Sequence, residues 1–297
     1  MIGELAALGA AICWTFSAVL YREALTDAKP LQANTVRCLG TSIILILCLA
    51  LAGKARVIAD LPLNTLAFTC LSGLVGLGLG DTLYLLSLKI IGVARAVPIT
   101  CTYPLFSLVW AVLLAGEDIK PPVVIGAIAI VFGIWLISRN EKVEEAKMPR
   151  NVLVKGIFVA LSTAIVWSIS ITLMNLAVKG DPGLENAFAI NTLRVAAISA
   201  FLLIFSPIAH EGFGFLKMKR KTIFMLLAGG IIALGLGWFF LALSFSYIPE
   251  SRAVPISSTT PFFSTLLGIL FLHEGATAKV ALGSAMIVFG IFLIFAV

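Results

Sequence analysis

Apolar runs alternate with short polar breaks along the whole chain of 297 residues. Most runs are about 18–22 residues long, the length at which one helix crosses the ~30 Å hydrocarbon core of a bilayer. Ten runs can be distinguished, at about 3–21, 31–52, 64–87, 93–115, 121–138, 154–177, 186–208, 222–246, 251–272 and 278–297. The pattern predicts an all-α integral membrane protein with ten transmembrane helices.

The chain also repeats itself. RAVPITCTYP begins at Arg95 and RAVPISSTTP begins at Arg252, with seven of ten letters identical at an offset of 157 residues. The one long polar break, residues 139–153, divides the ten runs into five and five. We therefore expect a first five-helix repeat at 1–138, a charged linker at 139–153 and a second five-helix repeat at 154–297.

The match extends well beyond the decapeptide. Further pairs at the offset of 157 are Asn34 and Asn191, Arg37 and Arg194, Gly73 and Gly230, Gly80 and Gly237, Glu117 and Glu274, Gly126 and Gly283, and Gly133 and Gly290. Trp14 and Ser17 match Trp167 and Ser170 at an offset of 153. Because each half has an odd number of spans, the second half must enter the membrane from the opposite side. Two inverted repeats are typical of carriers that work by alternating access.

Composition agrees with a membrane protein, since 60% of the residues are hydrophobic, 12% are charged and the mean hydropathy is +1.09. The net charge of +6 is therefore interpreted as loop charge beside anionic lipid and predicts no nucleic-acid partner. The five cysteines show no metal-ligand spacing, and we expect them to be small, buried apolar residues. No phosphate-binding loop is present, so no cofactor and no direct use of ATP are expected.

Loop charges predict the orientation in the membrane. The loops on the side of both termini carry five Lys and Arg residues, and the loops on the other side carry fourteen. The positive-inside rule places the more basic loops in the cytoplasm. We therefore expect a multi-pass protein of the cell membrane with loop 139–155 in the cytoplasm and both termini outside.

TYPLFSLVWAVLLAGE, from Thr102, and its counterpart TTPFFSTLLGILFLHE, from Thr259, resemble the EamA-type branch of the drug/metabolite transporter superfamily. The resemblance covers essentially the whole chain. It implies a carrier for small metabolites, often amino acids, with a central cavity lined mainly by the third, fourth, eighth and ninth spans. It also implies cytoplasmic termini, against the loop charges, and we keep the orientation from the charges.

The fourth and ninth spans carry two prolines each, which predict kinks and gating motions. Each pair is six residues apart: Pro98 and Pro104, Pro255 and Pro261. Polar residues gather at and between the prolines, namely Thr100, Thr102, Tyr103, Ser257, Ser258, Thr259 and Thr260. They could line a cavity for a polar solute, or the hydroxyls could bond to their own helix.

Charged residues inside the spans are candidates for substrate binding. Asp81 could contact a substrate amine, bind a proton or form a structural ion pair, and Tyr84 shares its helix face. Arg37 and Arg194 could hold a carboxylate or phosphate, with Asn34 and Asn191 one turn earlier on the same faces. The alternatives for both arginines are snorkelling to the surface or an ion pair between helices.

Aromatic residues complete the candidate cavity. Trp14 and Trp167 lie in mid-span, where they could form cavity walls with Ser17 and Ser170 or serve as core or lipid-facing bulk. Trp238 stands in the second half at the position of Asp81.

Glu117, at the end of the fourth span, is expected to cap the following helix or bond loop amides, with gating as the alternative, and Glu274 is expected to do the same.

These features favour a monomeric secondary transporter for a small polar metabolite, such as an amino acid, working in export by alternating access. A proton or an exchanged solute could be coupled to transport. An exchanger of organic anions or sugar conjugates is the alternative within carriers. An intramembrane enzyme is disfavoured because both histidines, His210 and His273, lie in loops and acids inside spans are nearly absent.

Overall fold

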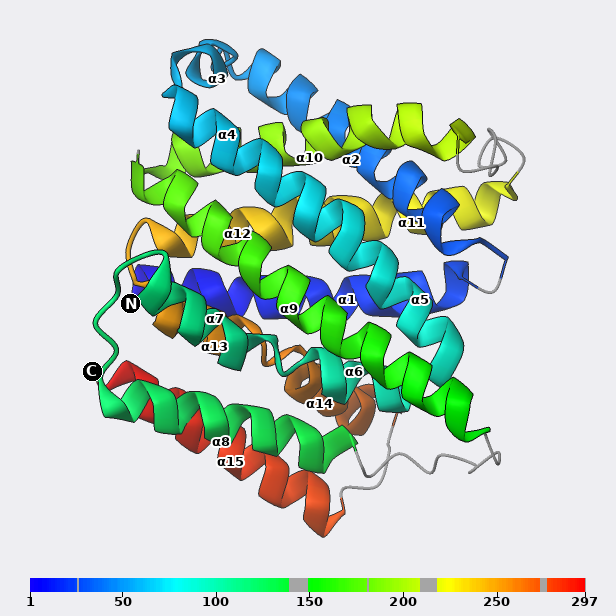
Figure 1. Cartoon of the computed structure of the whole chain (residues 1–297), viewed down its shortest axis with the longest axis vertical. Coiled ribbons are helices and arrows are strands. Elements are labelled where there is room, and N and C mark those ends of the chain that lie inside the picture. The colour runs from blue at the N-terminus through cyan, green and yellow to red at the C-terminus, as the bar shows by residue number, and fades with distance from the viewer. Residues whose placement is uncertain (26, 139–148, 181, 209–217, 273–276, 297) are drawn as a thin grey trace.

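The computed structural model is built of helices packed into one body (Figure 1). It describes all residues except 26, 139–148, 181, 209–217, 273–276 and 297, and the described residues contain no strand. The first half holds α1 (Ile2–Ala24), α2 (Pro30–Leu51), the short α3 (Arg56–Asp60), α4 (Leu63–Ser72), η1 (Gly73–Gly80), α5 (Asp81–Ile91), α6 (Val93–Thr100), α7 (Tyr103–Leu113) and α8 (Pro121–Ser138). The second half holds α9 (Arg150–Gly180), α10 (Leu184–Ile208), α11 (Arg220–Gly230), η3 (Ile231–Gly237), α12 (Trp238–Phe245), α13 (Glu250–Ser257), α14 (Thr260–Leu272) and α15 (Ala278–Phe295).

Eight helices in the described part of the chain are long and apolar enough to cross a membrane. They are Ile2–Tyr21, Pro30–Leu51, Leu63–Ile91, Pro121–Ser138, Arg150–Gly180, Leu184–Phe205, Arg220–Phe245 and Ala278–Phe295. The protein is therefore a multi-pass membrane protein. Both chain ends lie at the same end of the bundle (Figure 1).

The two other expected spans, 93–115 and 251–272, are not continuous helices. α6 ends at Thr100 and α7 begins at Tyr103, while α13 ends at Ser257 and α14 begins at Thr260. Pro98 lies inside α6 and Pro255 inside α13, and the second proline of each pair, Pro104 or Pro261, is the second residue of the next helix. A proline donates no backbone hydrogen bond and its ring clashes with the preceding turn, so each pair explains the break.

Each half packs mainly against the other half rather than against itself. α1 runs along α11, η3 and α12, and α9 runs along α4, η1 and α5. Gly237 accordingly faces the indole of Trp14, and the equivalent Gly80 faces the indole of Trp167. A methyl group on either glycine would lie within 3 Å of the ring, so glycine is required at both crossings.

α8 and α15 form a separate antiparallel pair along one side of the bundle (Figure 1). Their backbones touch at two levels, where Gly126 meets Gly290 and Gly133 meets Gly283. A Cβ atom on Gly133 would lie 2.6 Å from the carbonyl oxygen of Gly283, and the reverse substitution gives 2.7 Å. Only glycine lets these two helices approach so closely.

The glycine-rich segments η1 and η3 are π-helical, which the glycine pattern did not lead us to expect. They occupy equivalent positions in the middle of the helices Leu63–Ile91 and Arg220–Phe245. Another backbone comes close at the start of both segments. A Cβ on Gly73, the first residue of η1, would lie 2.4 Å from the carbonyl oxygen of Arg194, and one on Gly230, the last residue of α11 directly before η3, would lie 2.9 Å from that of Arg37. π-Helical turns inside α-helices are frequent at functional sites.

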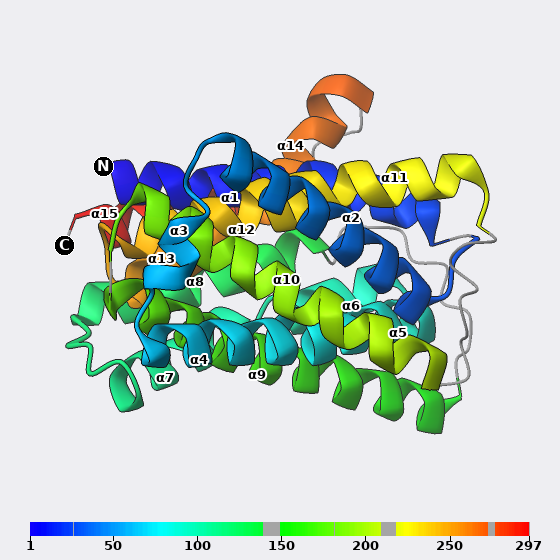
Figure 2. The same cartoon turned by 90° about the horizontal axis from the view of Figure 1, so that it is seen from above.

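The two halves differ in how their broken helices pack. α13 packs against α7 near the end of the bundle that carries the termini. The equivalent helices α6 and α14 do not pack in the same way among the described residues. They overlap in Figure 1 but are well separated in Figure 2, where α14 projects from the body.

Candidate functional site

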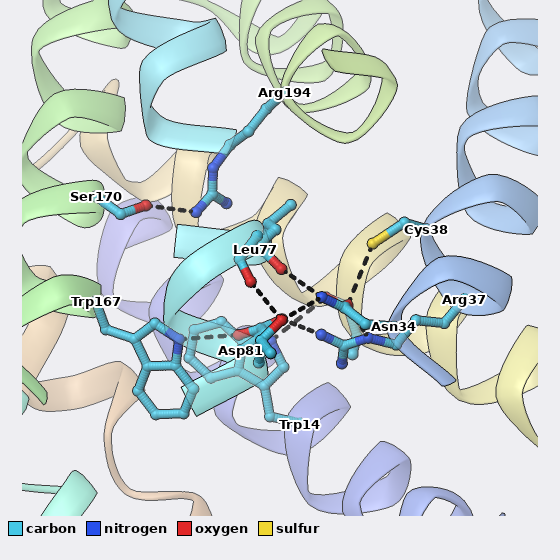
Figure 3. Close-up of polar contacts among 12 residues, drawn as sticks. Trp14, Asn34, Arg37, Cys38, Leu77, Asp81, Trp167, Ser170 and Arg194 are labelled. Atoms are coloured by element: carbon cyan, nitrogen blue, oxygen red, sulfur yellow. Dashed lines mark hydrogen bonds and ion pairs between the residues drawn. The ribbon is translucent and has the colours of Figure 1, made fainter. Parts of the chain in front are cut away.

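The first polar cluster lies between α2, α5 and α9 (Figure 3). Arg37 on α2 forms an ion pair with Asp81 at the start of α5, and both side chains are less than a tenth exposed. The other carboxylate oxygen of Asp81 accepts a hydrogen bond from Trp167 Nε1 at 2.9 Å. The pair therefore joins two helices of the first half to one of the second.

Asn34 orients the arginine. Its Oδ1 accepts a hydrogen bond from Arg37 Nε at 2.9 Å, and its Nδ2 donates to the carbonyl oxygen of Leu77 at 2.8 Å. Leu77 lies in η1, where the π-helical turn leaves carbonyl groups available to side chains. The expected pairing of Asn34 and Arg37 on one helix face is thus present, and the irregular turn supplies its acceptor.

The second polar cluster surrounds Arg194 on α10, which has no exposed surface. Arg194 Nε donates to Ser72 Oγ at 2.9 Å, and one terminal nitrogen donates to Ser170 Oγ at 3.0 Å. Its guanidinium carbon lies 3.9 Å from the centre of the Trp238 ring, a cation–π contact. The remaining nitrogen, Nη1, has no hydrogen-bond partner among the described residues.

The two arginines are thus held by different chemistry at equivalent positions. The carboxylate of Asp81 neutralises Arg37, whereas Arg194 lies on the ring of Trp238, the residue equivalent to Asp81. Snorkelling is wrong for both arginines, since Arg37 is 6% exposed and Arg194 0%. The second half repeats one detail, because Asn191 Nδ2 donates to the carbonyl oxygen of Leu234 in η3 at 2.8 Å.

Aromatic rings lie beside both clusters. Trp14 and Trp238 meet edge to face with ring centres 5.1 Å apart. Trp167 lies 4.9 Å from Tyr84 and 6.1 Å from Tyr103 between ring centres. Trp14, Trp167 and Tyr84 are only partly buried, while Tyr103 and Trp238 are buried. The five rings therefore form two groups: Trp14 with Trp238, and Trp167 with Tyr84 and Tyr103.

The hydroxyl residues at the helix breaks lie mostly in the protein interior and bond locally. Ser257, Ser258 and Thr259 are buried and donate to carbonyl oxygens three residues earlier, at 2.7–3.0 Å. Similar bonds are made by Thr102 to Ile99 at 2.7 Å and by Ser17 to Trp14 at 3.0 Å. Thr100 is 1% exposed, and Thr260 donates to the carbonyl oxygen of Ala11 at 3.3 Å. In this conformation these hydroxyl groups bond to backbone carbonyl oxygens, which is the alternative to lining a cavity.

A third polar group, which the sequence did not reveal, lies at the end of the bundle that carries the termini. Glu250, the first residue of α13, is 0% exposed and accepts hydrogen bonds from Thr172 Oγ1 at 2.6 Å and Asn175 Nδ2 at 3.0 Å. The neighbouring carboxylate of Glu117 accepts from Lys179 Nζ at 2.9 Å. We call these five residues the carboxyl cluster.

Glu117 also binds the start of α13. Its two carboxylate oxygens accept the backbone N–H groups of Glu250 and Ser251 at 2.9 and 3.0 Å. The expectation that Glu117 caps the following helix or bonds loop amides is wrong about the partner, because the amides it binds are the first two of α13 rather than those of α8 or of a loop. Glu274, for which the same role was expected, lies outside the described residues.

The electrostatics of Glu117 follow from these partners. Burial raises the pKa of Glu117, but the hydrogen bonds from Lys179 and from the amides of Ser251 and Glu250 outweigh it and hold the pKa below its usual value. Glu117 is therefore ionised when Lys179 and α13 are in place. A second ion pair on the same end joins Arg252 to Glu4 at 2.9 Å.

The described part of the chain contains no group of three His, Cys, Asp or Glu side chains that could hold a metal ion. All five cysteines are free thiols, and Cys38 is buried. The expectation of burial is wrong for Cys48, which is on the outer surface of the bundle. The polar clusters offer an ion pair, hydrogen bonds and a cation–π contact.

Comparisons with known proteins agree with this architecture. The model of the EamA-like transporter family matches residues 1–139 and again residues 154–296. The chain is similar to an uncharacterized transporter of Archaeoglobus fulgidus (28% identity, over 99% of this chain and 98% of that one) and to the uncharacterized transporter YvbV of Bacillus subtilis (25% identity, over 95% and 88%). A solved crystal structure shares the fold with a TM-score of 0.74 at 19% identity, over 98% of this chain and 95% of that one. The chain belongs to the EamA-like transporter family.

Proposed function

We propose that the chain is a secondary carrier that moves a small polar metabolite by alternating access. The ten segments of the two halves, eight continuous and two broken by proline, would cross the membrane as inverted repeats. The observation that carries the proposal is the unequal packing of the broken helices, with α7 against α13 at one end and α6 apart from α14 towards the other. In a chain of two similar halves, exchanging the two arrangements would open one side and close the other.

An amino acid or related zwitterion, moved in export, is the proposed substrate. Partly buried aromatic rings, Trp14, Trp167 and Tyr84, lie next to a charged pair, Arg37 and Asp81, and together could take a solute with an apolar part and two charges. The loop charges support an orientation with both termini outside and loop 139–155 in the cytoplasm. In that orientation the carboxyl cluster would face the outside.

An organic anion or sugar conjugate is the second candidate, supported by the unpartnered Nη1 of Arg194. A guanidinium nitrogen without an acceptor in a buried site could bind a carboxylate or phosphate oxygen once the site opens. Arg37 would contribute less, because Asp81 already neutralises it.

Counterflow in proteoliposomes tests the proposal. Vesicles that contain the full chain are preloaded with one unlabelled compound, and uptake of its radiolabelled form is followed for a panel of amino acids and organic anions. Saturable accumulation of one class would support a carrier and identify the substrate. Non-saturable flux of unrelated solutes would instead indicate a pore, and no flux with any compound would count against transport of the tested classes.

A further inference from the structure

The carboxyl cluster contains more acid than its one cation can neutralise. Lys179 Nζ bonds to Glu117, and Glu117 also receives two backbone N–H groups. Glu250 receives only the neutral donors of Thr172 and Asn175. Asn175 Nδ2 is shared between both carboxylates, at 3.0 Å from Glu250 and 3.4 Å from Glu117. Two ionised carboxylates this close in a buried site repel each other, and the acid with the poorer partners takes up a proton.

We propose that Glu250 is a proton-binding site that links closure of the end with the termini to pH, and this inference rests on the proposed carrier function. Glu250 takes up one proton from the water at the end with the termini as that end closes, and it returns the proton to that water when the end opens.

Asn175 supports the proton independently of the two acids. It is 0% exposed, and its Oδ1 has no hydrogen-bond partner among the described residues. A buried amide oxygen without a donor is costly, and a carboxylic acid O–H supplies the missing donor when the amide turns over. The same side chain can thus serve both the ionised and the protonated form of Glu250.

Proton release is linked to opening through Glu117. The carboxylate that Glu250 would repel is the one that holds the backbone N–H groups of Glu250 and Ser251. Loss of the proton therefore weakens the contact between the segment after α7 and the start of α13. The first half has Val93 at the position of Glu250, so the proton-binding side chain belongs to one end of the carrier only.

The charged groups around Glu250 are few. Glu117 and Lys179 face it, while Glu4 on α1 and Arg252 on α13 pair with each other. α8 and α12 carry no ionisable side chain. Glu250 precedes the apolar run that starts at residue 251 and lies outside the eight long spans. Burial raises the pKa of Glu250 to about 8, and the charge of Glu117 acts in the same direction, against the hydrogen bonds from Thr172 and Asn175.

Hydrogen exchange in proteoliposomes that contain the full chain tests the site without a substrate. After correction for the intrinsic effect of pH, α13 amides of the wild type should lose protection as the pH rises from about 4.5, the ordinary pKa of the group, towards about 8, and should show no further loss above that pH. The loss should be up to about tenfold per pH unit for one released proton. Glu250→Gln should keep its protection across this range. Glu185→Gln, which removes an exposed carboxylate elsewhere in the chain, should follow the wild type. Equal protection of the wild type at all pH values, or opening of Glu250→Gln like the wild type, would overturn the proposal.

Infrared spectroscopy gives a second measurement that does not depend on the folding of a variant. The wild type should show the carbonyl stretch of a protonated carboxyl group, which disappears as the pH rises through about 8. Glu117→Gln should move this loss to lower pH, because it removes the neighbouring negative charge. Absence of such a band in the wild type below that pH would overturn the proposal.

Counterflow separates this inference from the proposed function. Saturable counterflow that responds neither to pH nor to Glu250→Gln would overturn the link between Glu250 and closure and leave the carrier intact. Exchange that depends on pH and on Glu250, with no counterflow by any compound, would support the proton site and count against transport of the tested classes.

Discussion

The guanidinium of Arg194 lies 3.9 Å from the centre of the Trp238 ring, at the place where the first half pairs Arg37 with Asp81. A buried arginine in each half is thus held by a carboxylate in one case and by an aromatic face in the other. The two arginines occupy equivalent positions, and the group that contacts each of them differs. This difference leaves Arg194 with an unpartnered nitrogen and makes the two halves chemically unequal.

The contact between Arg194 and Trp238 should be measurable as a coupling energy. In a double-mutant cycle with Arg194→Met and Trp238→Leu, we expect about 2 kcal/mol, since the pair is desolvated. The free energy of unfolding in detergent micelles provides the measurement. A coupling energy below about 0.5 kcal/mol would show that the ring serves only as packing.

Asp81→Asn should impair transport and lower stability together. The change leaves Arg37 buried without its counter-charge, which typically costs about 3–5 kcal/mol. The double variant Arg37→Gln/Asp81→Asn should recover part of this loss because no unpaired charge remains. Thermal unfolding and counterflow of the same preparations provide the measurements.

Arg37→Lys, which keeps the positive charge, should do less harm to transport than Asp81→Asn. Normal transport by folded Asp81→Asn would exclude a functional role for the acid and leave only a structural ion pair.

Gly73→Ala should destabilise the bundle, because its methyl group would lie 2.4 Å from the carbonyl oxygen of Arg194. A backbone atom cannot move aside cheaply, so we expect a loss of about 1–3 kcal/mol in unfolding free energy. Gly235→Ala is the matched control, since its methyl group would meet neighbours at 3.7 Å or more in the equivalent π-helical segment. Equal losses for the two variants would mean that flexibility of the segments, rather than close packing, requires glycine.

The contribution of Glu117 to stability should depend on pH in the acid range. Its pKa is lower in the folded protein than the ordinary value of 4.5, so its stabilising effect is fully present above that value and is lost as the pH falls through the lower folded pKa. Glu117→Gln should therefore be less stable than the wild type near neutral pH and approach it in acid. Thermal midpoints across this range provide the measurement, and a constant difference between the two proteins would contradict the expectation.

The sequence predicted many of the helices and the two helix breaks, because the lengths of the apolar runs, the paired prolines and the repeat at an offset of 157 residues can be recognised in it. The same letters indicated the position of Asn34 beside Arg37 and of both tryptophans in mid-span. They could not show that η1 and η3 are π-helical or that α10 and α2 of the other half approach these segments closely, because such contacts join residues far apart in the chain.

The partners of Arg194 and Glu250 were also beyond the sequence. Ser72 and Thr172 are ordinary helix residues in composition, and their roles arise from contacts between helices far apart in the chain. One signal was present for Glu250, since it is an acid directly before a repeated segment and stands where the first half has Val93. Pairing of Glu117 with that segment required the three-dimensional structure.

The packing of each half against the other has a consequence for biosynthesis. Arg194 finds Ser72 only across the boundary between the halves, and α9 finds α4 and α5 in the same way. When only the first half of the chain has been synthesised, the faces of α4 and α5 that pack against α9 have no partner helix. An isolated second half would keep Ser170 and Trp238 beside Arg194 but would lose Ser72, the acceptor of its Nε group. We therefore expect the packing of both halves to be completed only after the last helices have left the ribosome.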